Sequence, residues 1–148
     1  MKISTKGRYG LRILFDIAIN ANGTPRMLKD IAASQNISEK YISRLVIDLR
    51  EAGLVKSVRG SKGGYMLAKF PEEITLLQVV EIMEGHVNIV DCVMSPSVCD
   101  QVKVCTVRKV WTALNDKIRA ALGEVTLKDI VDQDRQDRRD GVFVEYCI

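Results

Sequence analysis

The sequence has little of what most enzymes and membrane proteins need. It contains one histidine, His86, and neither a G-x-S-x-G motif nor a P-loop, so acid-base and phosphoryl-transfer chemistry have few candidate residues. No apolar run approaches the roughly 20 residues of a membrane-spanning helix. The N-terminus lacks a long apolar segment followed by a small-residue cleavage site. We therefore expect a non-enzymatic protein that is soluble and cytoplasmic.

The composition favours a protein that folds without disulfide bonds. The 148 residues fit one ordinary domain or a small domain with an extension. A hydrophobic content of 47% is enough for a sizeable core. Because thiols stay reduced in the cytosol, the four cysteines, three of them clustered, indicate metal or redox chemistry.

The net charge of +3 combines two unlike halves. Residues 1–70 carry 13 basic and 5 acidic side chains, net +8, whereas the remainder carries 9 and 14, net −5. The first half therefore has the charge balance of a polyanion-binding protein. A solvated basic face without a partner would give the same count, so charge alone does not decide.

The N-terminal half predicts a helix-turn-helix unit. Helices are expected within 1–21, over 28–35 and over 38–52, with a tight turn at 36–37 and a stop at Gly53. The third helix has an apolar stripe, which leaves polar side chains near its start on other faces. Those side chains are Lys40, Tyr41, Ser43 and Arg44. This is the layout of a recognition helix for the DNA major groove, although such helix pairs also serve as plain packing elements.

The next segment predicts a wing. Residues 54–58 alternate like a strand, residues 59–64 form a glycine-rich turn, and residues 65–67 resume a strand. Glycines let the backbone approach a ligand closely, and Arg59 and Lys62 place cations near the tip. These features suit phosphate contact or insertion into a minor groove. A hairpin with merely solvated charges is the alternative.

The C-terminal half predicts a cysteine loop and a long helix. The expected division is 1–85 for a winged helix-turn-helix DNA-binding domain, 86–105 for the cysteine loop, 106–131 for a dimerisation helix and a return helix, and 132–148 for a charged tail. The long helix, ended by Gly123, carries an apolar stripe that a completed winged-helix domain would not cover. We therefore expect a homodimer seam there, with packing inside its own domain as the alternative.

Three cysteines, Cys92, Cys99 and Cys105, have the spacing C-x6-C-x5-C in this loop. Thiolates are the ligands of iron-sulfur clusters and of zinc. Zinc sites usually show closer pairs, so these gaps favour a cluster; three independent thiols are the alternative. The candidates for a fourth ligand are His86, Asp91, Asp100 and Cys147. A second subunit or an external thiol would serve equally.

Three segments together carry a family resemblance: residues 6–10 (KGRYG), residues 54–67 (LVKSVRGSKGGYML) and the cysteine trio. Over about residues 1–131 the chain resembles the IscR-type family of winged helix-turn-helix transcription regulators, in its iron-sulfur cluster-binding branch. The resemblance implies a homodimer on a promoter operator in double-stranded DNA. It also implies a [2Fe-2S] or [4Fe-4S] cluster as the sensor, and repression as the output.

By position, the resemblance makes the cysteine trio the cluster ligands. It makes Ser38, Lys40, Ser43 and Arg44 the base-reading or phosphate-contacting residues, and Arg59 the minor-groove arginine. Two positions depart from the family. Arg108 stands where cluster assembly repressors have a histidine ligand, and Arg8 stands where the nitric-oxide-sensing branch has a carboxylate ligand. Neither arginine can ligate iron.

The expected function is a transcription regulator that senses iron-sulfur, redox or nitric oxide status. The first alternative keeps the DNA-binding fold but makes the cysteines a metal-free thiol or small-molecule sensor. The second is an electron-transfer or cluster-carrier protein, whose basic half docks to an acidic partner.

Overall fold

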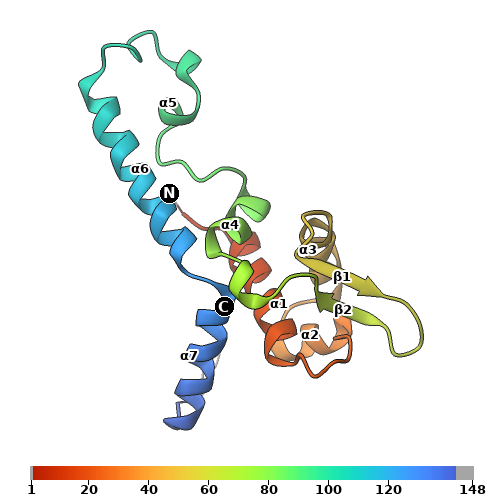
Figure 1. Ribbon diagram of the computed structural model, residues 1–148. Coiled ribbons are helices and arrows are strands. Elements are labelled where there is room, and N and C mark those ends of the chain that lie inside the picture. The colour runs from red at the N-terminus through yellow and green to blue at the C-terminus, as the bar shows by residue number, and fades with distance from the viewer. Residues whose placement is uncertain (1, 143–148) are drawn as a thin grey trace.

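The computed structural model describes residues 2–142. Its elements are α1 (Thr5–Ile19), α2 (Leu28–Gln35), α3 (Glu39–Glu51), β1 (Val55–Val58), β2 (Gly64–Leu67), η1 (Pro71–Glu73), α4 (Leu76–Glu84), α5 (Asp91–Met94), η2 (Pro96–Val98), α6 (Thr106–Glu124) and α7 (Leu127–Arg139). Helices α1 to α4 and the hairpin gather into one body, and α6 extends away from it (Figure 1). This mainly helical winged helix-turn-helix architecture confirms the expected fold class.

Local signals set the helix-turn-helix. Asn36 takes the left-handed conformation at the end of α2, with φ of 51°. The Ser38 side chain then accepts a hydrogen bond from the Tyr41 backbone N–H and caps α3. The apolar stripe of α3 is buried against α1 and α2, as its periodicity predicts.

Helix α7 completes this body, which we call the head: α1 to α4, the β1–β2 hairpin and α7. Leu127 and Val131 of α7 are buried in the same core as α1, so the expected return of the last helix is confirmed. The charged tail expected from residue 132 is wrong over 132–139, because the helix continues to Arg139. Ion pairs at helical spacing stabilise this continuation, including Lys128 with Asp132.

Helix α6 ends for a tertiary reason. Gly123 lies inside the helix, which runs to Glu124, so the stop predicted at this glycine is wrong. The chain leaves the helix at Val125, whose carbonyl accepts from the Leu76 N–H at 2.8 Å; the Leu127 N–H then donates to the Ile74 carbonyl at 2.8 Å. This short extended pairing with the residues before α4 redirects the chain into α7.

We call residues 86–105 the cysteine connector. It is less irregular than expected, because it includes α5 and η2. Figure 1 shows the connector at the end of α6 far from the hairpin. Within residues 2–142, no helix is both long and apolar enough to cross a bilayer.

Candidate nucleic-acid interface and cysteine connector

The start of α3 presents cations on an exposed face of the head. Lys40 and Arg44 are exposed, and Ser43 is half-buried with its hydroxyl donating to the Lys40 carbonyl at 2.8 Å. Tyr41 is half-buried and meets Tyr9 edge-on, with ring centroids 5.8 Å apart. The Tyr41 ring therefore helps to pack α3 on α1.

The hairpin places two more cations at its tip. Arg59 and Lys62 are exposed in the turn between β1 and β2, whose register pairs Val55 with Leu67 and Val58 with Gly64. The turn is closed by the Gly63 N–H donating to the Gly60 carbonyl at 3.0 Å. A tight tip of this kind can bring its arginine close to a polyanion without a bulky side chain intervening.

These cations are available for an external anion. Among the described residues, Lys40, Arg44, Arg59 and Lys62 form no ion pair. Lys6, in contrast, is paired with Asp48 at 2.9 Å. A cation that already has an ion-pair partner gains less free energy from binding a phosphate. The four unpaired cations are therefore the stronger candidates for contact with the DNA backbone.

The cysteine connector holds its thiols apart. Cys92 is half-buried in α5, Cys99 is exposed, and Cys105 is the N-cap of α6, where its Sγ accepts from the Arg108 backbone N–H at 3.3 Å. No group of three or more histidine, cysteine, aspartate or glutamate side chains within residues 2–142 is arranged to hold a metal ion. Three thiols suit a cluster chemically, but this arrangement does not fit one.

Among the described residues, the candidate fourth ligands do not complete such a site. His86 is exposed, with Nδ1 3.6 Å from the Glu81 carboxylate. Asp91 and Asp100 are exposed on the connector. Cys147 lies outside the described residues.

Three side chains of α6 hold the connector's backbone, and sequence reasoning missed this feature. Arg108 Nε donates to the Cys92 carbonyl at 2.9 Å, and Asn115 Oδ1 accepts from the Ile89 N–H at 3.1 Å. Arg119 donates to the Val87 carbonyl at 3.5 Å and to the Glu81 carboxylate of α4. The contacts run from the cysteines to the head. The only signal in the sequence was polar residues at helical spacing on a second face of α6.

Glu81 joins α4, α6 and the connector through its carboxylate. Burial is the largest single effect and raises the pKa of the Glu81 carboxyl, but the hydrogen bonds from Arg119 and the Val87 backbone N–H, with smaller favourable effects, together outweigh it and leave the pKa below its ordinary value. The charge of Arg119 acts in the same direction. The charged Glu81–Arg119 pair therefore anchors the base of α6 to the head.

The apolar face of α6, distinct from the polar face that holds the connector, is exposed. Val107, Val110, Trp111 and Leu114 recur at helical spacing and are 59%, 63%, 39% and 42% exposed. An exposed apolar stripe of this kind is a candidate surface for contact with another protein.

Comparison with known proteins agrees with this architecture. A family model described as Rrf2, an iron-dependent transcriptional regulator, matches residues 3–133. The chain is 39% identical over 130 residues to the HTH-type transcriptional regulator CymR of Bacillus subtilis, covering 88% of this chain and 89% of that protein. It is 34% identical over 131 residues to the HTH-type transcriptional regulator IscR of Escherichia coli, covering 88% and 80%. The solved structure of CymR, the global cysteine regulator of B. subtilis, superposes with a TM-score of 0.75 at 38% identity, covering 90% and 98%.

Proposed function

The chain belongs to the Rrf2 family of transcriptional regulators, and we propose that it binds a promoter operator as a homodimer and receives its signal at the cysteine connector. The family is one of DNA-binding regulators and not of enzymes. It includes relatives named CymR and IscR at similar identity to this chain. Membership of the iron-sulfur branch is accordingly part of the proposal.

The observation that supports a DNA interface is the set of unpaired cations on the head. In the proposed complex the start of α3 enters the major groove, where Ser38, Lys40, Ser43 and Arg44 contact base edges or phosphates. In this complex the wing tip lies along the DNA backbone, with Arg59 in the adjacent minor groove and Lys62 against a phosphate.

Replacing the wing cations tests this interface. In Arg59→Ala and Lys62→Ala, operator affinity should fall, and the slope of log affinity against log salt should become shallower by about 0.9 for each phosphate that is no longer neutralised. Fluorescence anisotropy with an operator duplex at several salt concentrations measures both quantities. Lys128→Ala removes an exposed lysine of α7 that pairs with Asp132, and it should leave the slope unchanged. Wing variants with the wild-type slope would contradict the assignment.

The apolar face of α6 supports the homodimer. A second copy offers the same stripe, so the two long helices can bury each other's valine and leucine side chains. Two heads joined in this way can read half-sites about one DNA turn, roughly 34 Å, apart. The orientation of α6 relative to each head then sets the spacing of the two recognition helices.

The cysteine connector is the proposed sensor because its backbone is attached to both α6 and the head. Cys105 stands at the start of α6, and Arg108, Asn115 and Arg119 fix the connector's backbone between Cys92 and Glu81 of the head. A chemical change at Cys92 or Cys105 would alter this attachment, and a ligand shifts such an equilibrium only through different affinity for its two states. The iron-sulfur cluster stays a prediction, supported by the three thiols and by the family description. Binding one would require the connector to rearrange.

Thiol sensing without a metal is the second candidate. It is favoured by the separation of the cysteines, since no three of the possible ligands among the described residues come together. In this case Cys99, the exposed thiol, would be the first to react with an external disulfide or oxidant.

Anaerobic purification separates the two candidates. With a cluster, the protein should be coloured, should contain iron and sulfide, and should lose both in Cys99→Ser but not in Ser97→Ala, a neighbouring control on the same connector. A colourless protein free of iron and sulfide would exclude the cluster. If neither iron removal nor Cys92→Ala changes the operator affinity, the connector is not the sensor. An electron or cluster carrier, the remaining alternative, predicts no sequence-selective binding to promoter fragments.

A further inference from the structure

Helix α1 contains a buried carboxylate that the proposed function does not use. Asp16 is 1% exposed and stands in the sequence between Phe15 and Ile17, both of which are buried. A buried charge is costly unless it is paired and hydrogen-bonded. The partners that compensate it therefore show what this residue holds together.

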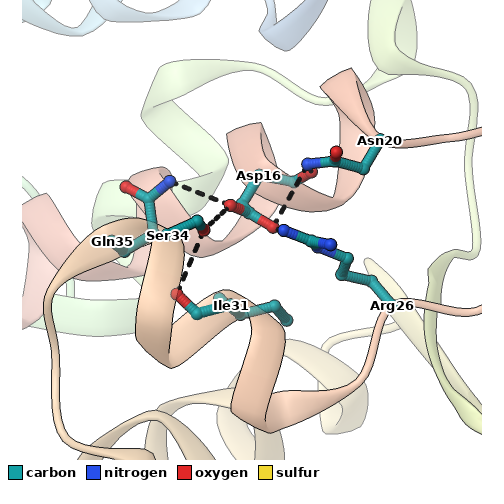
Figure 2. A network of polar contacts seen from close by, with 6 residues as sticks. All are labelled: Asp16, Asn20, Arg26, Ile31, Ser34 and Gln35. Carbon is teal, nitrogen blue, oxygen red and sulfur yellow. Dashed lines mark hydrogen bonds and ion pairs between the residues drawn. The ribbon is translucent and has the colours of Figure 1, made fainter.

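The partners come from three parts of the head (Figure 2). Arg26, in the loop before α2, donates through Nε to Oδ1 of Asp16 at 2.8 Å. Gln35 donates through Nε2 to Oδ2 at 3.0 Å, and the Ser34 hydroxyl donates to the same oxygen. Asn20, at the end of α1, donates to the Asp16 backbone carbonyl at 2.8 Å. Each carboxylate oxygen thus joins α1 to a different segment.

The Arg26 arm of this network reaches the wing. The Arg26 N–H donates to the Tyr65 carbonyl of β2 at 2.9 Å, and the Tyr65 N–H donates to the Arg26 carbonyl at 2.9 Å. Arg26 therefore binds α1 with its side chain and the wing with its backbone. Its loop thus forms a single antiparallel β-bridge with β2.

The Gln35 arm reaches the recognition helix. Ser34 and Gln35 are the last residues of α2, and Asn36 turns the chain directly towards the cap of α3. The Gln35 amide is fixed in orientation, because Arg12 Nε donates to its Oε1 at 3.1 Å while its Nε2 faces Asp16. The Asp16 carboxylate therefore also contacts the end of α2, from which the chain turns into α3.

We infer that Asp16 is a positioning residue that fixes the wing relative to the recognition helix, without touching DNA. This inference rests on the proposed DNA-binding function. Helix α3 is also held by its buried stripe. The wing packs on the core through Val55, Tyr65 and Leu67, and its hydrogen bonds to the loop before α2 come from Arg26. Loss of the Asp16 charge should therefore release the wing and leave α3 in place.

The test is a double-mutant cycle on operator binding. Asp16→Asn keeps the shape of the side chain but removes its charge, and it should weaken operator binding about tenfold while the α-helical content and the oligomeric state stay unchanged. In the Asp16→Asn background, Arg59→Ala should cost less than about twofold, because the released wing no longer places Arg59 on the DNA, while Arg44→Ala should keep its full cost. A role in stability alone would reduce the folded fraction and leave both costs unchanged.

Asp48→Asn is the electrostatic control. It raises the net charge by the same amount and removes an ion pair, that with Lys6, but it should leave the Arg59→Ala cost intact. If Asp16→Asn does not fold, Arg26→Gln enters the same cycle, since Arg26 is only partly buried and borders a cavity of about 620 Å³. An undiminished Arg59→Ala cost in the folded variant would overturn the inference. Absence of operator binding by the wild-type protein would instead overturn the proposed function.

Discussion

In Leu114→Glu, the proposed dimer should dissociate and operator binding should weaken by about 10²- to 10⁴-fold, the range by which linking two binding modules raises affinity. Leu114 lies in the exposed apolar stripe of α6, with Val110 and Trp111 beside it. In a helix pair related by twofold symmetry, each substitution appears on both sides of the seam. Two carboxylates would then have to be buried without partners, which costs several kcal/mol for each ion.

Ala120→Glu provides the matched control for this variant. Ala120 is exposed on α6 but lies on the face away from the stripe, so the same new charge stays in water. Native mass spectrometry gives the oligomeric state, and fluorescence anisotropy gives the operator affinity. A Leu114→Glu protein that remains dimeric at micromolar concentration would show that α6 is not the seam.

In Gly64→Ala, the wing should detach from the loop before α2, and the free energy of unfolding should fall by about 1–3 kcal/mol or more, the usual cost of overpacking. A Cβ at Gly64 would lie 2.5 Å from the Arg26 carbonyl oxygen and 2.7 Å from its carbonyl carbon. Both are backbone atoms, so no side-chain rotation can relieve the overlap. The two hydrogen bonds between Arg26 and Tyr65 would break as the strands separate.

Urea denaturation measures this loss of stability. Operator binding should also weaken, because Arg59 would no longer lie at its proposed position in the DNA minor groove. Gly123→Ala is the control. A Cβ at that position would meet nothing nearer than a Leu77 methyl carbon at 3.9 Å. Alanine is favoured over glycine inside a helix by about 1 kcal/mol, so this variant should be as stable as the wild type or more so. A Gly64→Ala protein with the wild-type denaturation midpoint would contradict the close approach.

The connector and the head lie at opposite ends of α6 in Figure 1, and a chain of polar contacts joins them. Arg108 holds Cys92, Asn115 holds Ile89, and Arg119 joins the connector's start to Glu81 of α4. Helix α4 packs on α1, the helix that carries Asp16. The proposed signal at the cysteines would therefore have a chain of contacts leading to Asp16, the proposed positioning residue of the wing.

The sequence by itself determined the helix-turn-helix and the hairpin of the head. Ser38 caps α3, Asn36 turns the chain in the left-handed conformation, and the apolar stripe of α3 fixes its buried face, all through interactions within a few residues. The alternation and glycines of residues 54–67 likewise determined the hairpin. These features were predictable because their causes are local in the chain.

Tertiary structure alone decided the rest. Pairing of Val125 with Leu76, and not Gly123, ends α6, and packing of Leu127 and Val131 on the core draws the charged segment into α7. Asp16 bonds to Arg26, Ser34 and Gln35, which are 10, 18 and 19 positions away along the chain, and Arg108 lies 16 positions from Cys92, whose carbonyl it binds. Spacing in the sequence shows which side chains could meet, but only the packing of the helices, by burying Asp16 and holding the connector along α6, selects those that do.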